Sequence, residues 1–495
     1  ETDGTSLPAQ FAKARAQARN GRHEKAYDTY HSAFSKTPVH HRGPWAPISV
    51  LDGRSGPGID QDAALLVDQK NAIPAGLSLL VLHEWWHGTQ ELDVAFQVGD
   101  DPSLALEAEE RIAYNASHRH LQARSLLWLC GGEEPIEARK ALEDADTKAL
   151  EDAGFARALP PAMADYRDIR ESLGPVAILS YRLGPHGGEA LAVTKADAVG
   201  IPLKPDAIRK AAVALRTSLA TGTASGGGAV SPMNGDVLRV QLLDPFQDVI
   251  SGTARYLVIP DGPLWGISMS ALPEQQAGRR YLADIRTIAY SATVATAHLD
   301  YDSTARKYSP EYLGLSVRPE SQAIGLDGTR IATETENTGR HFMPDLREIQ
   351  AGEGATGELL REKMPRARFI HLADLKGGSH GSIAFGDEDE VALHEVREQD
   401  LWSLVTILAS DVDPRVARRW TQAFHAAGVP DVITTRWKTP LQIRSRYFFA
   451  FFENYMQEGE VPRALTGARN LVLAEDGSDF TDPSWWGPYF LSGMP

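Results

Sequence analysis

The sequence predicts an α/β protein in which a helical region precedes a domain built on a mainly parallel β-sheet. Three observations lead to this prediction. Small and aromatic residues recur at helical spacing within residues 10–38, and further helical stretches are predicted at 62–97, 102–129 and 135–153. The composition changes at Pro160-Pro161. Beyond this point three buried apolar runs each end in a polar loop, at residues 256–272, 368–378 and 404–414.

Composition limits the class of protein. A chain of 495 residues is long enough for two or three domains at about 150 residues per domain. The formal net charge of −16 argues against general nucleic-acid binding, because contacts to phosphate groups need clustered Lys and Arg. No apolar run reaches the length of about 18 residues that a membrane-spanning helix needs. We therefore expect neither a nucleic-acid partner nor a membrane span.

The number of cysteines and the identity of the first residue indicate in which cellular compartment the protein is expected. The only cysteine, Cys130, excludes an intramolecular disulfide and fits a reducing compartment, so we expect the protein in the cytoplasm. The first residue is Glu1 instead of Met, so we expect that a preceding segment has been removed. Any targeting signal, including a signal peptide, would lie in that segment.

The first domain, residues 1–160, is predicted to be an irregular helical array. Within residues 10–38, Ala26, Tyr30, Ala33 and Pro38 follow one another at offsets of four, three and five. This spacing resembles a tetratricopeptide (TPR) repeat, in which small residues lie where two helices cross and a proline ends the pair. Such arrays most often bind peptides or other proteins, so we expect a protein or peptide partner.

The second domain, residues 165–495, is predicted to have an N-terminal half at about 165–300 and a second half at about 310–495. Its pattern predicts, in chain order, two strands joined by a Gly-rich turn (178–193), a helix (205–221), a flexible loop (220–235), a polar loop (317–341) and an aromatic tail that packs on the sheet (482–495). The three buried runs that end in polar loops are predicted to end at one edge of the sheet. A site is therefore expected at their carboxyl ends.

Four segments together resemble the CHAT domain, a caspase-like and separase-like fold that is usually attached to TPR repeats. They are VIPDGPLWGISMSAL, FIHLA, LVTILAS followed by AFHAAGVPDVITTRWKTP, and SWWGPYFLSG. The resemblance covers about 165–495 and implies a caspase-like domain with a mainly parallel sheet. It also implies a setting that is common for TPR-CHAT proteins, namely bacterial conflict and cell-death systems.

Active members of this family resemble caspases in using a His–Cys dyad, in which a thiolate attacks the peptide carbonyl. In this sequence the aligned positions hold Leu375 and Asp411. A leucine cannot transfer a proton, and an aspartate carboxylate is a poor nucleophile toward an amide. The resemblance therefore implies a pseudopeptidase that works as a protein-binding or regulatory module.

Other histidines and the cysteine do not restore this dyad. His371 belongs to the predicted strand and is interpreted as a packed residue. His380, followed by Gly381, is a displaced His-Gly pair without a thiol beside it. Cys130 ends an apolar helix and is interpreted as an ordinary buried cysteine.

Three loop carboxylates, Asp374, Asp411 and Asp413, allow two interpretations. They could bind a divalent cation, because hard cations favour oxygen ligands. Alternatively, they are solvated residues that initiate turns. In either case Asp411 makes the former catalytic pocket acidic, which would favour basic peptides.

One motif with the form of a catalytic site is intact. His83 and His87 of HEWWH lie four residues apart and share one face of a helix, so both imidazoles could hold one zinc ion. Glu84 would then act as the general base for a bound water. The third ligand would be Glu110, with Glu107 as the second choice. This set resembles a small gluzincin site and predicts, as the alternative function, a zinc metallopeptidase whose CHAT domain recognises a substrate or partner.

The same helix also fits a repeat without metal. Leu82, Trp86 and Ala95 have the spacing of the Leu, aromatic and Ala positions of a TPR repeat. The two histidines would then be polar residues beside a packed tryptophan, and the protein would need no cofactor.

Overall fold

The structure is a computed structural model. It describes residues 163–183, 188–224, 232–274, 281–291, 309–319, 331–378, 382–386, 388–410, 414–474 and 483–493, with isolated positions or short stretches between 10 and 132 and at 294, 323–324 and 412. Within these residues no helix combines the length and the apolar character needed to cross a membrane.

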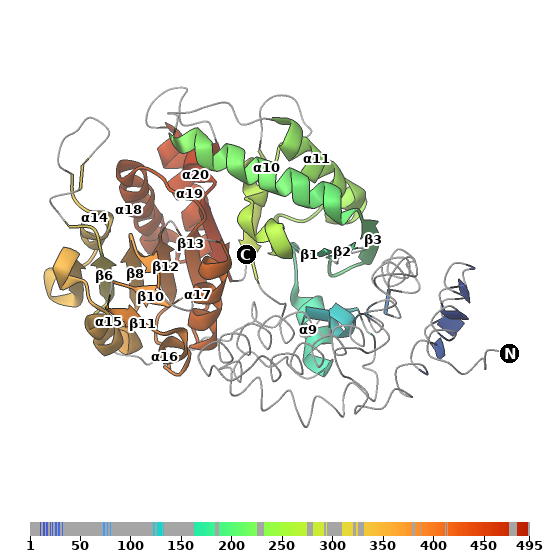
Figure 1. The fold of residues 1–495 in the computed structure, drawn as a ribbon, viewed down its shortest axis with the longest axis horizontal. Coiled ribbons are helices and arrows are strands. Elements are labelled where there is room, and N and C mark those ends of the chain that lie inside the picture. Colours follow the sequence, from blue (N-terminus) through green and yellow to red (C-terminus); the bar gives the residue numbers. More distant parts are fainter. Residues whose placement is uncertain are drawn as a thin grey trace, which may run out of the picture.

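An eleven-stranded sheet organises the described residues (Figure 1). From one edge to the other the strands are β3 (Ala198–Leu203), β2 (Gly188–Val193), β1 (Val176–Leu183), β4 (Arg255–Ile259), β5 (Thr287–Tyr290), β14 (Tyr489–Ser492), β13 (Asp431–Thr435), β12 (Val405–Ala409), β8 (Phe369–Ala373), β6 (Tyr312–Ser316) and β7 (Arg347–Ala351). Seven of the ten neighbouring pairs are parallel, so the predicted α/β class with a mainly parallel sheet is confirmed.

The direction of the strands reverses in the middle of the sheet. The last strand, β14, runs parallel to β5 but antiparallel to β13. Consequently β4 points the opposite way from β8 and β12. The prediction that β4, β8 and β12 end at one edge is wrong for β4. Strand β14 lies between the two halves of the sheet and pairs in antiparallel fashion with β13, so the parallel strands of one half run opposite to those of the other. The candidate site is formed by β8 and β12 alone.

Helices cover both faces of this sheet (Figure 1). They are α9 (Met163–Ser172), α10 (Pro205–Ala224), α11 (Pro232–Leu242), α12 (Gln247–Ile250), α14 (Glu334–Gly339), α15 (Gly357–Lys363), α16 (Leu393–Arg397), α17 (Pro414–Ala426), α18 (Leu441–Glu458), α19 (Val461–Ala474) and α20 (Pro483–Trp486). A second, three-stranded sheet consists of β9 (Lys376–Gly377), β10 (Ile383–Ala384) and β11 (Glu390–Val391).

Strand β8 shows why these strands read as continuous apolar runs. Phe369 and Ala373 pack in the same cluster as Phe448 of α18, whereas Ile370 packs in the same cluster as Trp420 of α17. Both faces of the strand are therefore buried, and every position in FIHLA is inaccessible to solvent. A strand that is covered on both sides needs apolar residues at successive positions, without the alternation of a half-exposed strand.

Several predicted elements are confirmed. The segment 178–193 forms β1 and β2, and the helix expected at 205–221 is α10. The aromatic tail does pack on the sheet, since it supplies α20 and the central strand β14. Helices extend into both ends of the segment 220–235, where a flexible loop is expected: α10 continues to Ala224 and α11 begins at Pro232, and residues 225–231 lie outside the described residues.

The polar loop predicted at 317–341 is wrong in part, because α14 lies within it. Thr333 caps this helix: its hydroxyl accepts a hydrogen bond from the backbone N–H of Glu336, and the Glu336 carboxylate accepts one from the backbone N–H of Thr333. This capping box starts a helix without any apolar periodicity. The buried residues of α14 include Glu334 and Thr335, so the segment reads as a loop although its inner face is in the core.

Candidate functional site

The loops that follow β8 and β12 are fastened to each other. The backbone N–H of Asp374 donates to the carbonyl of Ala409 at 3.0 Å. The next N–H, that of Leu375, donates to the hydroxyl of Ser410 at 3.0 Å. Thr435 in turn donates its hydroxyl to the carbonyl of Ser410 at 2.8 Å. These hydrogen bonds join the ends of β8, β12 and β13, at the edge where the CHAT resemblance places the dyad.

Leu375 is a core residue. Its side chain is 3% exposed and packs in the cluster that contains Ile383 of the small sheet and Trp420 of α17. The Leu375 side chain therefore points into the apolar interior. The loop has therefore become part of the packing between the two sheets.

Asp374 is held by two arginines. Its backbone φ is +56°, in the left-handed region that residues other than glycine rarely adopt. Its carboxylate accepts hydrogen bonds from Nε and Nη2 of Arg318 at 2.9 and 3.0 Å, and from Nη2 of Arg444 at 2.7 Å. Burial alone would raise the pKa of Asp374, but the two guanidinium groups outweigh it and hold this pKa below its ordinary value.

The polar contacts continue from Asp374 into the core. Arg444 Nε lies 2.9 Å from Glu334 Oε2, and Glu334 Oε1 lies 2.8 Å from His371 Nε2. His371 Nδ1 lies 2.9 Å from the hydroxyl of Tyr312. With Arg318 these residues form a chain of six polar side chains, which we name the buried polar chain. It connects β6, β8, α14 and α18 with the loop after β8.

The charges in this chain are mutually compensated. Burial would lower the pKa of Arg444, but the carboxylates of Glu334 and Asp374 raise it above its ordinary value. Burial and the nearby charge of Glu334 raise the pKa of Tyr312 well above its ordinary value. Arg444 is therefore a cation between two acids, and Tyr312 is neutral. Such a group is costly to disrupt, because removing one member leaves an uncompensated charge in the core.

Tyr312, His371 and Glu334 superficially resemble an acid–base relay, but their environment is that of a structural network. Glu334 and His371 have no exposed side-chain surface, and Tyr312 is fully buried. His371 packs edge-on against Phe448, with ring centroids 5.0 Å apart. The interpretation of His371 as a packed strand residue is therefore confirmed.

Of the three loop carboxylates that could bind a divalent cation, the structure describes only one. Asp374 is described, and its oxygens are occupied by arginine. Among the residues that the structure describes, no group of three or more His, Cys, Asp or Glu side chains is arranged to hold a metal ion. The following residues of the sequence predictions lie outside the described residues: His83, Glu84, His87, Glu107, Glu110, His380, Gly381, Asp411 and Asp413.

Cys130 is described and lies far in sequence from positions 375 and 411. It follows the helical positions Leu126–Leu129 and packs against the same core cluster as Phe448, but it is half-buried and not fully buried as expected. Burial raises the pKa of its thiol to about 12, although the charge of Arg170 acts in the opposite direction. Cys130 is therefore a protonated thiol at neutral pH, as expected for a cysteine that has a packing role.

Sequence reasoning missed Glu334, Arg444 and Arg318. Two local signals were present for the first two residues. The Thr333-to-Glu336 spacing is that of a capping box. Arg444 lies four residues before Phe448 and so falls on the apolar stripe of α18, where a charge needs a buried partner.

The comparison with family models agrees with this geometry. The model of the CHAT domain matches residues 235–494, which is more than half of the chain. The chain belongs to the CHAT domain family, and the resemblance found in the four sequence segments is confirmed.

Comparison with solved structures gives two examples from one complex. Structures of the Saccharomyces cerevisiae separase–securin complex at 2.6 and 3.0 Å resolution are similar to this chain at 9% and 10% sequence identity, each with a TM-score of 0.48. The similarity covers 99% and 100% of this chain but only 40% and 41% of the chains in those structures. No curated protein sequence matches the chain.

Proposed function

We propose that this CHAT-domain protein binds a protein or peptide partner and does not cleave it. The observation that carries the proposal is the chemistry of its only cysteine. Cys130 packs against the core in the helical part of the chain, where burial raises the pKa of its thiol to about 12. A cysteine peptidase needs a thiolate beside the substrate, and this chain has no second cysteine to supply one.

The geometry of the β8–β12 edge supports the proposal. The side chain that follows Asp374 is a buried leucine, so no imidazole occupies the position of the histidine. The residue after Ser410 in the sequence is an aspartate, which cannot replace the thiol as a nucleophile toward an amide. Arginine pairs and backbone hydrogen bonds stabilise the edge in this form.

The expected combination of a helical region with a CHAT domain supports a regulatory role. The helical region and the CHAT domain are both suited to protein contacts. The family resemblance implies a setting in bacterial conflict and cell-death systems. There, a domain that binds without cleaving can hold the targets of an active relative or control that relative.

The experiment that tests this proposal is a peptidase measurement on the purified chain. A peptide library is incubated with the protein, and new termini are identified by mass spectrometry. We expect no cleavage that a thiol reagent blocks. Thiol-sensitive cleavage that is lost in Cys130→Ser would contradict the proposal.

A second candidate function is zinc-dependent peptide hydrolysis, which the intact HEWWH motif favours. His83, His87 and Glu110 would hold the metal, and Glu84 would take a proton from the attacking water. In that case the CHAT domain would recognise the substrate or partner.

Zinc content distinguishes the two candidates. The chain is purified without chelator, and zinc is measured by atomic emission in the wild type, His83→Ala and His87→Ala, with His118→Ala as the matched control. The pseudopeptidase proposal predicts a zinc content well below one per chain that added metal does not raise. One zinc per chain that is lost in His83→Ala and His87→Ala, but kept in the control, would establish the zinc site and make Glu84→Ala the next variant.

A further inference from the structure

Strand β7 is an edge of the main sheet within the described part of the chain. It pairs with β6 on one side, and no described strand pairs with its other side. Alternate N–H and C=O groups of an edge strand point outward and can pair with an added strand. All five residues of β7 are half-buried, so the strand lies near the surface along its length.

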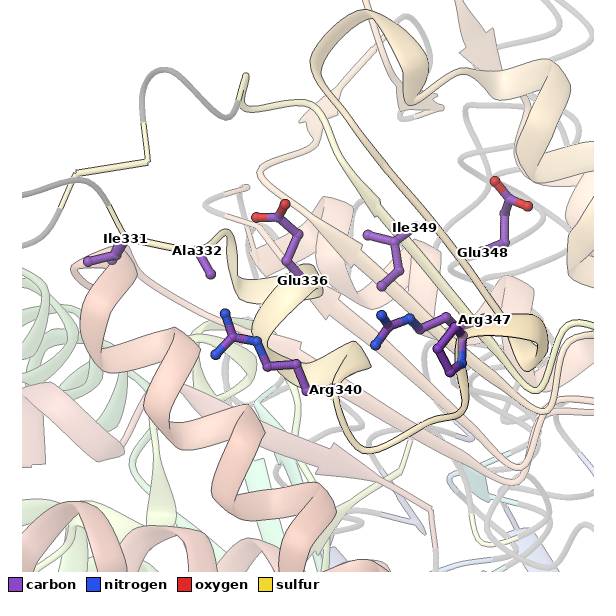
Figure 2. A pocket seen from close by; sticks show the side chains of 8 residues that line it. Ile331, Ala332, Glu336, Arg340, Arg347, Glu348 and Ile349 are labelled. Atoms are coloured by element: carbon purple, nitrogen blue, oxygen red, sulfur yellow. The ribbon is translucent and has the colours of Figure 1, made fainter.

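An open hollow of about 720 Å³ lies beside this edge. It is lined by residues of α14 and β7 and of the segments next to them, including Ile331, Glu336, Arg340, Arg347, Glu348 and Ile349 (Figure 2). Ile349 packs under α14 against Gly339, so the hollow lies where the outer side of this short helix meets the edge strand. The hollow is separate from the β8–β12 edge, which contains Asp374 and Leu375.

Neither arginine of the hollow forms an ion pair with its two carboxylates, Glu336 and Glu348, which are held by neutral donors. Glu336 is engaged by the cap of α14, where it accepts from Thr333 N and Oγ1 at 2.7 and 2.9 Å. Glu348 accepts from the side chain of Gln350 at 2.9 Å. Arg340 is exposed and forms no ion pair with any residue that the structure describes.

Arg347 adds a second positively charged side chain to the lining of the hollow. Its Nη1 donates to the carbonyl of Gly339 at 2.8 Å, which fixes the guanidinium against α14 without cancelling its charge. Figure 2 shows Arg340 and Arg347 extending to the same side, with Glu348 set apart from them. Neither guanidinium is thus paired with a carboxylate of the described residues, and each can pair with an anionic group of a ligand.

Apolar side chains lie in the hollow and in the chain segment beside it. Ile331 and Ile349 line the hollow. Met343 and Leu346, in the segment between α14 and β7, are 67% and 38% exposed. This surface therefore combines an unpaired strand edge with two cations and nearby apolar side chains. These features fit an extended peptide that carries an acidic and an apolar side chain.

We propose that the free edge of β7 binds an extended peptide by strand addition. The peptide backbone pairs with the outward groups of β7, and an acidic side chain lies at Arg340 and Arg347. Residues two apart share one face of a strand, and Ile349 lies two positions from Arg347 on β7, so an apolar side chain two positions from the acid lies over Ile349. This inference rests on the proposed protein-binding function and names the chemistry of the partner segment.

The test uses a fluorescein-labelled decapeptide in which Thr occupies every second position and the positions between are Asp and Val in turn. Its binding to the full chain is measured by fluorescence anisotropy. We expect saturable binding that weakens at least tenfold in Arg340→Gln/Arg347→Gln. The matched control is Lys204→Gln/Lys210→Gln, which removes two exposed charges at α10 and is expected to bind like the wild type. A peptide with Lys in place of Asp is expected not to bind.

Hydrogen–deuterium exchange tests the backbone part of the proposal. Bound peptide is expected to slow exchange of the amides of β7. Absence of binding at millimolar peptide, equal binding by both double variants, or binding without protection of β7 would overturn the proposal. Concentration-dependent dimerisation through β7, seen by sedimentation and lost in Arg340→Gln/Arg347→Gln, would show instead that the edge pairs with a second copy. Cleavage of the decapeptide would contradict the proposed function, whereas failure to bind contradicts only the edge site.

Discussion

Replacing Arg444 by methionine is expected to lower the free energy of unfolding by about 3–5 kcal/mol. The guanidinium is buried between Glu334 and Asp374, and its loss leaves two carboxylates without their shared cation. The measurement is urea denaturation followed by far-ultraviolet circular dichroism. Arg446→Met on the exposed side of α18 is the matched control, with an expected change within about 0.5 kcal/mol.

The double variant Glu334→Gln/Arg444→Met shows whether the effects of Glu334 and Arg444 on the free energy of unfolding depend on each other. Removing both charges is expected to cost less than the sum of the single changes, because neither partner is left as a buried ion. Additive costs would show that the buried polar chain does not act as a unit.

The pH dependence of stability tests the same contact. The folded-state pKa of Asp374 is lowered from 3.8, so its ion pairs stabilise the folded state above pH 3.8 and lose this effect as the pH falls through the lowered pKa. Arg444→Met is expected to lose less stability than the wild type over this acidic range.

Leu375→His is expected to destabilise the chain by about 2–4 kcal/mol, because it removes buried leucine contacts and places a polar ring in an apolar cluster. The side chain is 3% exposed and packs with Trp420, so the new imidazole has no access to solvent. Chemical denaturation measures the change. Leu375→Met, which conserves volume, is the control and is expected to cost less than about 1.5 kcal/mol.

Equal stability of Leu375→His and Leu375→Met would contradict the packing of this loop. It would mean that position 375 faces open space, as a catalytic histidine would. The expected loss of stability instead indicates that a histidine cannot be returned to this position without repacking the region between the two sheets.

Most of the second domain could be predicted because its signals are local. Buried strands such as 369–373 are continuous apolar runs, and α10 has clear helical spacing. The direction of β4 relative to β8 could not be predicted in this way. It depends on where β14 inserts, and this pairing joins residues that are about 60 to 200 positions apart in the chain.

The buried polar chain was missed for a related reason. Glu334 and Arg444 each look like surface residues when read alone, since charged side chains are seldom fully buried. Their burial makes sense only as a pair, and the pair is formed by contact between α14 and α18. Local pattern gives the cap of α14 and the apolar stripe of α18, but it does not give the partner of a buried charge.

The most direct test of the central claim is the peptide-library measurement carried out on three proteins in parallel: wild type, Cys130→Ser and Glu84→Ala. Each is assayed with and without a thiol reagent and a chelator. Binding without cleavage predicts that no new termini appear with any of the three. Cleavage blocked by the thiol reagent, or cleavage blocked by the chelator and lost in Glu84→Ala, would contradict this account and identify the protein as a peptidase.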